Sequence, residues 1–591
     1  MAKITPENDL EIRRKHSGSH IMTAAVQKIY GDSVGLGVGP WTDEGFYQDF
    51  DFGATTLAEN DLAKIEKEMG EIVKKNLPII KVEMNADEAR KICKGDPYKT
   101  ELVEEIIARG DLISFYYIGE SLDKAISVNL CAGPHLEKTG ELGAFKLMRI
   151  AGAYWRGDEK NKMLTRIYGI AFPTQEELDA YLKQREEAEK RDHKKIGKEM
   201  GLFTVSDLVG KGLPMYLPKG NIIRTELENF IRHEKEALGY SFVTIPHIAK
   251  KELYIRSGHL GKYDAMMPIM KDENGEEFVL KAMNCPHHFE LYNAQPHSYK
   301  DLPFRIAENT VVYRNEKSGE LSGLLRVKGL CQDDTHHVIR LDQIESEIKM
   351  IHGLMQKVYS IFGFDDYKVE ISIRDPKNKE KYFGSDEVWQ NAENILIEQV
   401  KTWGVPFSIE EGEAAFYGPK IDIRVKDCIG REWQLTTIQL DFNQPENFDM
   451  DYTGEDGKKH RVVVLHVAIF GSFERFFGIL IEHYAGAFPL WLSPTQVKVL
   501  SVSEKHAEYA KEVVGELKAA GIRAETDDSN ESLGKKIRAG KMEKVPYLLV
   551  VGDKEVEAKT VSVESRDAGK LDINKLDDFI VRASEEIKNK K

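Results

Sequence analysis

The stretch from Thr174 to about Met200 limits what this chain can fold into more than any other segment, because most of its residues are charged. It begins with a capping-box pattern, Thr174 followed three places later by Glu177, which is typical of a helix start. A helix that is polar on all sides has no face to bury in a core, so we predict one solvent-bridging helix between globular parts. At 591 residues the chain is also too long for a single hydrophobic core.

The segments on either side of this linker, which we place at residues 174–203, predict different domains. Residues 1–173 mix helix-like and strand-like segments, including a helical pattern at Ile21–Ile29, and predict an α+β domain. Residues 204–492 contain many β-rich apolar runs at irregular spacing, which favours a largely antiparallel sheet with helices. The clearest of these runs are Phe242–Ile248, Tyr367–Ile373, Lys420–Val425 and Val462–Ile469.

Residues 493–591 alternate strand and helix patterns regularly, which is typical of a small α/β domain. The alternating elements are expected at Val497–Val502, Glu504–Ala520, Leu533–Met542 and Tyr547–Val551. The whole chain is therefore predicted to be an α+β multidomain protein.

Composition excludes several classes of protein. The five cysteines, Cys93, Cys131, Cys285, Cys331 and Cys428, are too sparse for a disulfide scaffold and are expected as free thiols, core residues or ligands. No apolar run approaches the length of a membrane span, and the first residues lack the apolar core of a secretory signal, so we expect a soluble cytoplasmic protein. A net charge of −15 repels polyanions, so any RNA must meet local basic patches.

Two short sequence motifs in the central part contain arginines suited to phosphate binding. Tyr313–Glu316 is followed by Arg326, and Gly471–Arg475 lies further along the chain. The guanidinium fork fits carboxylates and phosphates, although each arginine taken alone is more often part of a surface salt bridge. No glycine-rich phosphate loop is present, so a nucleotide site would have to rely on side-chain charge.

Taken together, the longer sequence motifs of the chain resemble those of bacterial-type threonyl-tRNA synthetase, a class II aminoacyl-tRNA synthetase. The resemblance runs from about His16 to the C-terminus, and we expect this chain to lack the small ubiquitin-like domain that precedes the editing domain in the commonest members. The matching words are LPKG and GYSFVTIPHI (Leu217–Gly220, Gly239–Ile248), AMNCPHH (Ala282–His288), VYRNEKSGEL to DDTHH (Val312–His337), FYGPKIDI (Phe416–Ile423), REWQLTTIQLDF (Arg431–Phe442) and GSFERFFGIL (Gly471–Leu480).

The resemblance implies a class II antiparallel catalytic core, an α+β editing domain and a C-terminal anticodon-binding domain. The expected reaction joins L-threonine to tRNA(Thr) with ATP and Mg²⁺, in a homodimer. Three arginines would be catalytic: Arg314 would bind the α-phosphate and the threonine carboxylate, Arg326 the polyphosphate and Arg475 the γ-phosphate. Glu316 would bind the adenine amino group. The residues implied for the threonine pocket are Met283, Gln332, Asp334, Tyr417 and Gln434, the last of which would also contact ATP.

The resemblance also implies one zinc ion, bound by Cys285, His336 and His466. Spacing alone does not predict this site, because structural zinc motifs are much tighter, and the ordinary alternative is a buried cysteine with two satisfied histidines. Valine is nearly isosteric with threonine, and shape alone discriminates such a pair by only about 100-fold. A metal that accepts the amino and hydroxyl groups of threonine, with Asp334 bonded to that hydroxyl, would exclude valine.

Three residues of the central domain depart from the family. His287 stands where glycine is common, Leu330 where an aromatic stacks on adenine, and Leu435 where cysteine is common. Losing the stacking ring would cost about 1 kcal/mol. Leu435 would narrow the pocket on its methyl side, and neither change removes a reacting group.

In the N-terminal part, His16 and His20 share one face if the segment is helical, and Cys131 and His135 form a second pair. The four could form a tetrahedral zinc site or be unrelated surface residues. The resemblance offers a third interpretation, an editing site that deacylates Ser-tRNA, with Lys99 as a further member. Such a site is needed because serine lacks only one methyl of threonine. The departures here are Gln48 for Tyr, Asn129 for Asp and Ala132 for Arg.

Near the C-terminus the resemblance implies that Asn530, Lys544 and Glu555 contact anticodon bases. Lys544 and Glu564 stand where arginine is usual, so base reading is expected to be weaker or rearranged. The ordinary alternative for the lysine-rich run beyond Asn530 is a solvated helix face.

Two other functions remain as alternatives. One is a catalytically silent, RNA-binding regulatory paralogue, which the intact Arg314, Arg475 and zinc-ligand set disfavours. The other is a related ligase for serine or proline, which Asp334 with three metal ligands disfavours.

Overall fold

The computed structural model describes residues 9–427 and 430–591 and divides the chain into two compact units, Met1–Glu186 and Glu187–Lys591. No helix of the described ranges is both long and apolar enough to cross a membrane. The cysteines described are free thiols at Cys93, Cys131, Cys285 and Cys331. Cys428 lies outside the described residues.

The first unit combines a helical layer with two antiparallel sheets, in the strand orders β1-β2-β7-β6 and β3-β4-β5. The long buried helix α1 packs on α2 and on strands β2 and β7. Its elements are α1 (Leu10–Tyr30), β1 (Gly35–Leu36), β2 (Phe46–Asp51), α2 (Glu59–Lys74), β3 (Ile79–Glu83), α3 (Ala86–Ile92), α4 (Pro97–Arg109), β4 (Ser114–Ile118), β5 (Ser127–Leu130), β6 (Ala144–Tyr154) and β7 (Met163–Phe172).

Helix α1 has clear local causes. Asp9 accepts hydrogen bonds from the backbone N–H groups of Glu11 and Ile12 at 2.9 and 3.4 Å, which caps the helix start. Gly18 lies where the helix crosses Phe46 of β2, and a Cβ there would come within 2.5 Å of the ring. The helix can therefore approach the sheet closely on the turn that separates His16 from His20.

The linker is two helices, α5 (Gln175–Arg191) and α6 (His193–Glu199), where the sequence predicted one. The predicted capping box is confirmed, with Thr174 and Glu177 exchanging side-chain to backbone bonds of 3.2 Å. The single helix is wrong because Asp192 leaves helical geometry and accepts from Lys194 N–H at 2.7 Å, starting a new helix. The second helix is not solvent-bridging either, since His193 and Ile196 are buried.

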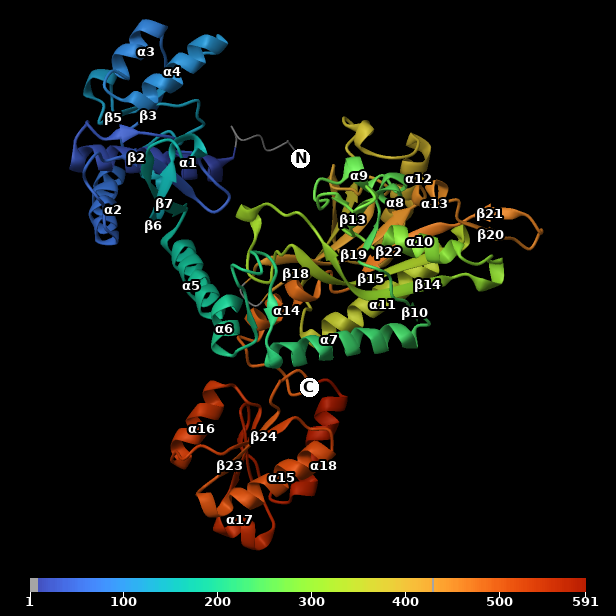
Figure 1. The fold of residues 1–591 in the computed structure, drawn as a ribbon. Helices are drawn as coiled ribbons and strands as arrows, with labels where there is room; N and C mark the ends of the chain where they lie inside the picture. Colours follow the sequence, from blue (N-terminus) through green and yellow to red (C-terminus); the bar gives the residue numbers. More distant parts are fainter. Residues whose placement is uncertain (1–8, 428–429) are drawn as a thin grey trace. The chain divides into compact units, whose positions relative to one another are not determined.

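The central part of the second unit is built on an eight-stranded sheet in the order β10-β14-β15-β22-β19-β18-β16-β17. Its inner pairs are antiparallel, as predicted, and the edge pairs β10/β14 and β16/β17 are parallel. Helices α7 and α11 lie side by side against it (Figure 1), where Phe230 of α7 and Phe362 of α11 meet with ring centroids 5.8 Å apart.

The strands of this part are β8 (Phe203–Thr204), β9 (Met215–Tyr216), β10 (Ser241–Phe242), β11 (Ile248–Lys250), β12 (Met270–Lys271), β13 (Glu277–Leu280), β14 (Phe304–Tyr313), β15 (Gly329–Ile339), β16 (Tyr367–Ile373), β17 (Phe407–Glu411), β18 (Lys420–Lys426), β19 (Glu432–Asp441), β20 (Asp451–Thr453), β21 (Lys459–Arg461) and β22 (Val463–Ala468). Its helices are α7 (Pro218–Ala237), α8 (Lys251–Arg256), α9 (His259–Lys262), α10 (Cys285–Asn293), α11 (Ile344–Phe362), α12 (Asp386–Thr402), α13 (Gln444–Asn447) and α14 (Phe473–His483).

One predicted strand of this part is wrong. The run Phe242–Ile248 does not form a single strand, but ends β10 and begins β11 in a different sheet. Pro246 interrupts the run because proline has no N–H to give to a ladder.

The C-terminal part contains a five-stranded sheet in the order β24-β23-β25-β26-β27, with β23, β24 and β25 parallel as the predicted α/β alternation requires. Helices α15, α16 and α18 surround this sheet (Figure 1). The elements are β23 (Val497–Ser501), α15 (Ala507–Ala519), β24 (Ala524–Asp527), α16 (Leu533–Met542), β25 (Tyr547–Val551), α17 (Asp553–Ala558), β26 (Ser562–Ser565), β27 (Gly569–Lys570) and α18 (Leu576–Lys588).

Candidate active site

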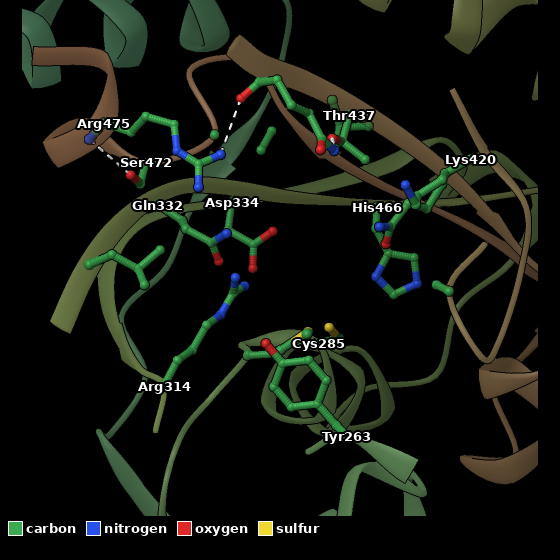
Figure 2. Close-up of a pocket in the computed structure, with 18 of the residues that line it drawn as sticks. Tyr263, Cys285, Arg314, Gln332, Asp334, Lys420, Thr437, His466, Ser472 and Arg475 are labelled. Carbon is green, nitrogen blue, oxygen red and sulfur yellow. Dashed lines mark hydrogen bonds between the residues drawn. The ribbon is translucent and has the colours of Figure 1, made fainter. Parts of the chain in front are cut away.

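A cavity of about 500 Å³ opens over the middle strands of the eight-stranded sheet. In Figure 2, Arg314 extends toward Gln332 and Asp334, while Cys285 and His466 face the same space from the other side. The residues predicted from the sequence that line this cavity are Met283, Cys285, Arg314, Glu316, Arg326, Gln332, Asp334, Tyr417, Gln434, His466 and Arg475.

Strand geometry explains how residues far apart in the sequence meet here. Gln332, Asp334 and His336 alternate along β15, so their side chains leave the same face of the sheet. His336 lies directly opposite His466 of β22 in the antiparallel register. Cys285 stands at the start of α10, and its Sγ lies with the two imidazoles so that all three ligand atoms are within 4.8 Å of one another.

The arginines place positive charge at one end of the cavity. Arg314 follows β14, and its Nε is buried without a hydrogen-bond partner among the described residues. Arg475 donates from its guanidinium to the carbonyls of Leu325 at 3.1 Å and Gln434 at 3.3 Å. Burial lowers the pKa of Arg475, and the neighbouring charges of Arg314 and Arg326 lower it further. An arrangement of this kind favours a polyanion, which would relieve the repulsion between the guanidinium groups.

Arg326 and Glu316 are paired with each other. Arg326 contacts Glu316 at 2.9 Å and Glu320 at 2.7 Å, and about half of its side chain is exposed. Both residues line the cavity, so the ion pair lies at its rim. An exposed pair of this kind is worth little energetically, so a ligand can exchange it for other contacts at small cost.

The Cys285, His336 and His466 cluster fits a metal ion. His336 Nε2 and His466 Nδ1 are buried and, within residues 9–427 and 430–591, lack a hydrogen-bond partner. The other nitrogen of His466 lies 2.9 Å from Asp441 Oδ2. A carboxylate only accepts, so Nε2 carries the proton and Nδ1 presents its lone pair toward Cys285, as a metal ligand requires.

His336 is oriented in a similar way. Its Nδ1 lies 2.7 Å from Nδ1 of His288, and Nε2 of His288 is 3.6 Å from Glu308 Oε2. A proton on His336 Nδ1, donated to His288, leaves His336 Nε2 free for a metal and puts the proton of His288 toward the carboxylate.

The predicted amino-acid pocket also has internal supports. Asn284 donates to Asp334 Oδ2 at 2.9 Å, and Tyr417 stacks on His466 with ring centroids 4.8 Å apart. The Gln434 amide donates to Asp422 Oδ1 at 2.6 Å. These contacts hold the pocket residues in place.

Sequence reasoning did not predict the supporting roles of Asn284, His288 and Asp441. All three lie inside motifs on which the family resemblance rests, AMNCPHH and REWQLTTIQLDF. Asn284 adjoins Cys285 and His288 follows it within the same motif, whereas Asp441 lies 25 residues from His466 and has no proposed metal ligand beside it in the sequence.

The three departures in this domain lie in different places. Leu330 and Leu435 both line the cavity and are nearly buried. His287 does not line it, and both of its ring nitrogens are buried without a partner in the part of the chain that the structure describes. Burial lowers the pKa of His287 to about 4, so this imidazole is neutral.

In the first unit, the predicted quartet does come together. His16 Nε2 and His135 Nε2 both lie 3.3 Å from Cys131 Sγ, and the rings of His20 and His135 are 4.2 Å apart. Nδ1 of His16 donates to the Pro134 carbonyl at 3.1 Å, which leaves Nε2 with a lone pair. Burial lowers the pKa of His16 to about 4. These neutral groups could act as bases toward water or bind a metal ion, since their ligand atoms all lie within 4.8 Å.

The neighbours of this quartet are less uniform. Lys99 is buried on α4, and burial lowers its pKa while the nearby Cys131 raises it. Gln48 lies on β2, with its amide nitrogen bonded to the carbonyls of Gly37 and Asp49 rather than to the quartet. Asn129 has a buried amide oxygen without a hydrogen-bond partner in the described ranges. Cys131 and Ala132 follow β5, which carries Asn129.

The predicted anticodon residues occupy three different settings. Asn530 is exposed just before α16. Glu555 Oε2 accepts from the Gly552 N–H at 3.0 Å and so caps α17. Lys544 donates through Nζ to the carbonyl of Ala485, in the central part of the same unit. Glu564 pairs with Lys541 at 2.6 Å, so the negative charge at that position is balanced locally.

Three family models match the chain. Residues 113–168 match the "Threonyl and Alanyl tRNA synthetase second additional domain". Residues 269–484 match the "tRNA synthetase class II core domain (G, H, P, S and T)". Residues 496–586 match the "Anticodon binding domain".

Curated relatives match nearly the whole chain. The threonine–tRNA ligase of Porphyromonas gingivalis is 47% identical over 577 residues, which cover 97% of this chain and 87% of the relative. That of Deinococcus radiodurans is 49% identical over 561 residues, covering 93% and 85%. Among solved structures, the RNA binding domain of threonyl-tRNA synthetase from Cryptosporidium parvum aligns with a TM-score of 0.64 at 36% identity, covering 67% of this chain and 98% of that one.

Proposed function

This chain belongs to the threonine–tRNA ligase family of class II aminoacyl-tRNA synthetases, and from that premise we propose a role for each residue of the cavity. The overall reaction joins threonine to tRNA(Thr) and converts ATP to AMP and diphosphate. The observation that carries the residue roles is a cavity lined by an arginine cluster and by Cys285 and His466, which are grouped with the buried His336.

In the first step, a carboxylate oxygen of threonine attacks the α-phosphorus of ATP. The bond to the β-phosphate oxygen breaks, and diphosphate leaves. Arg314, with its unpartnered Nε, binds the α-phosphate and the carboxylate, so charge in the transition state is neutralised where it develops. Arg475 binds the γ-phosphate. Mg²⁺ accompanies ATP and supplies further neutralisation of the polyphosphate.

The other nucleotide contacts come from the rim of the cavity. Glu316 binds the adenine amino group and Arg326 the polyphosphate, which requires their present ion pair to open. Gln434 contributes from β19, where its carbonyl already bonds Arg475. Leu330 covers the base without the stacking that an aromatic ring would give.

Threonine is recognised by the other end of the cavity. Cys285, His336 and His466 would hold zinc, which would act as a Lewis acid toward the amino and hydroxyl groups of threonine. Asp334, oriented by Asn284, accepts from the hydroxyl. Valine keeps the amino group but has no hydroxyl, so it would lose one contact to the metal, would leave Asp334 unpaired, and is rejected. Met283, Gln332 and Tyr417 form the remaining walls.

In the second step, the terminal hydroxyl of tRNA attacks the carbonyl carbon of threonyl-adenylate and AMP leaves. Asn530, Lys544 and Glu555 read the anticodon, in line with the match of residues 496–586 to an anticodon-binding model. Two copies associate as a homodimer, as the resemblance implies, and the enzyme works in the cytoplasm. The domains are residues 1–173, 174–203, 204–492 and 493–591.

The N-terminal quartet hydrolyses mischarged Ser-tRNA(Thr), a function that fits the match of residues 113–168. His16 Nε2 holds a water molecule and takes its proton as the water oxygen attacks the ester carbonyl. The proton then passes to the ribose oxygen of the tRNA as the ester C–O bond breaks, so serine and tRNA with a free terminal hydroxyl are released. His20, Cys131 and His135 enclose the ester, and Lys99 contributes positive charge.

Amino-acid-dependent ATP–diphosphate exchange with all twenty amino acids tests the activity directly. Threonine should give the dominant signal, serine a weak one and valine only background. A stronger signal with another amino acid would contradict the substrate assignment. Complete absence of exchange would favour the silent RNA-binding paralogue, which the relatives do not support.

A further inference from the structure

Outside the cavity, one buried histidine connects the linker to the nucleotide end of the active site. His193 opens α6 and is 1% exposed. Its Nδ1 lies 2.7 Å from Glu482 Oε1 on α14, and its Nε2 lies 3.0 Å from the backbone nitrogen of Leu324. Leu324 belongs to the turn Ser322–Arg326, in which the Ser322 carbonyl accepts from the Leu325 N–H at 2.8 Å.

The partners of His193 settle its protonation. A backbone N–H can only donate, so Nε2 must present a lone pair, and the proton sits on Nδ1 and is donated to Glu482. Burial lowers the pKa of His193 to about 4, in agreement with a neutral ring. The ligand atoms of Asp192, His193 and Glu482 are close enough to suggest a metal. Both nitrogens of His193 are already used, so this cluster is not a metal site.

The turn is shaped around this imidazole. Gly323 has a φ of +50°, and a Cβ on it would lie 2.1 Å from His193 Nε2. On the other side, Arg475 donates to the carbonyl of Leu325 at 3.1 Å. The turn is therefore held by a hydrogen bond to the N–H of Leu324 and another to the carbonyl of Leu325, and the next residue is Arg326.

We propose that His193 is a positioning residue for ATP, which fixes the turn Ser322–Arg326 so that Arg326 and Arg475 engage the polyphosphate together. The proposal rests on the assignment of these arginines to ATP under Proposed function. His193 lies outside residues 269–484, the part matched by the class II core model. The linker helix thus supplies a support that the core itself does not contain.

Two variants separate hydrogen bonding from ring volume. His193→Phe keeps an aromatic ring but leaves the buried Leu324 N–H without an acceptor, so the turn loses its fixed position. The KM for ATP in the exchange reaction should rise about tenfold, a change of roughly 1.4 kcal/mol. The KM for threonine and the zinc content should stay within about twofold. His193→Gln keeps one donor and one acceptor on a single planar group and should restore the KM for ATP to within about threefold of wild type.

Gly323→Ala disturbs the same contact, between His193 and the N–H of Leu324, by a change in the turn. Its Cβ would collide with His193, so it should raise the KM for ATP as His193→Phe does. Adding His193→Ala to Gly323→Ala removes the clash, and the double variant should be no worse than the worse single variant. Ile196→Val is the matched control, because Ile196 is buried on the same helix and a general loosening of α6 would lower the melting temperature without a selective rise in the KM for ATP.

Arg326→Ala distinguishes failure of the proposal from failure of the site assignment. If Arg326→Ala raises the KM for ATP while His193→Phe and Gly323→Ala leave it at the wild-type value, the positioning role is wrong. If Arg326→Ala itself leaves the KM for ATP unchanged, the assignment of the turn to ATP is wrong. Equal rises for ATP and threonine in both His193 variants would also overturn the proposal, because a purely structural defect does that.

Discussion

Replacing Asp441 by Asn should weaken the proposed zinc binding without removing any of the three proposed ligands. In the structure Asp441 Oδ2 lies 2.9 Å from His466 Nε2, while Oδ1 accepts from the backbone N–H groups of Asn443 and Gln444 at 2.8 and 2.9 Å. An Asn side chain keeps its oxygen on those two N–H groups and therefore turns its NH₂ toward His466. Nε2 of His466 must then accept, and the proton moves to Nδ1, the nitrogen that faces Cys285 and His336.

The magnitude follows from the loss of that one fixed lone pair. Loss of the hydrogen-bond partner of a metal-ligating histidine typically lowers metal affinity about 10- to 100-fold, or by roughly 1.4 to 2.7 kcal/mol. Zinc affinity is measured by competition with a chromophoric chelator, and the threonine-dependent exchange is followed at fixed free zinc. The variant should recover exchange when free zinc is raised by about the same factor, since its three ligands are still present.

Asp451→Asn is the matched control, because Asp451 pairs with Arg461 in the same domain and does not contact the ligand set. It should bind zinc as wild type does. Wild-type zinc affinity in Asp441→Asn, with an unchanged melting temperature, would refute the reasoning from the tautomer of His466. A defect in Asp441→Asn that excess zinc cannot repair would show that Asp441 acts on something other than the metal.

Arg314→Ala should lower threonine-dependent exchange at least about 100-fold with an unchanged melting temperature, because only charge at the reacting phosphate is lost; wild-type exchange would place the site elsewhere. The double variant His16→Ala, Cys131→Ala should lose hydrolysis of preformed Ser-tRNA(Thr) and keep threonine exchange, and equal background hydrolysis by wild type and variant would refute the editing role. Burial raises the pKa of Glu474 to about 7 in the folded chain, against 4.5 for the exposed group. The unfolded chain therefore ionises first, and the stabilisation from this group, complete below pH 4.5, falls by about 3 kcal/mol as the pH rises to 7. Calorimetry of Glu474→Gln should show a flatter dependence of melting temperature on pH between 4.5 and 7. The same slope as wild type would contradict a raised pKa for Glu474.

Much of the secondary structure follows from local patterns. The predicted strand Tyr367–Ile373, helix Leu533–Met542 and strand Tyr547–Val551 are found at those bounds. The capping box at Thr174 is also found. Each of these segments has a clear period or start signal, and neighbouring elements reinforce it rather than override it.

The prediction for the linker was wrong because its local sequence patterns were weak. Its many charges predicted a single solvated helix, but the fold of α6 is decided by a few residues that the charge count hides. His193 finds a donor and an acceptor in two other elements, and Ile196 enters the central core. Tertiary contacts of this kind override the polarity of a segment, and no spacing rule reveals them.

The candidate site shows why spacing in the sequence could not predict the proposed metal ligands. His336 and His466 become neighbours only because β15 and β22 pair in one particular register. A slip of one residue would place Leu465 or Val467 opposite His336 and turn His466 to the other face of the sheet. The register must therefore be fixed by something other than the ligands themselves.

Asp333 does this from the opposite face of β15. Its carboxylate accepts from the backbone N–H groups of Ile469 at 2.9 Å and Phe470 at 3.0 Å, just beyond the end of β22, and it pairs with Lys235 at 3.0 Å. A slip of β22 would leave this buried carboxylate with Lys235 alone, which is costly in a site with no exposure to water. Asp333, next to the proposed threonine ligand Asp334, thus sets the alignment on which the proposed metal ligands depend. One face of β15 carries the residues proposed to recognise threonine, and the other carries the residue that fixes the register.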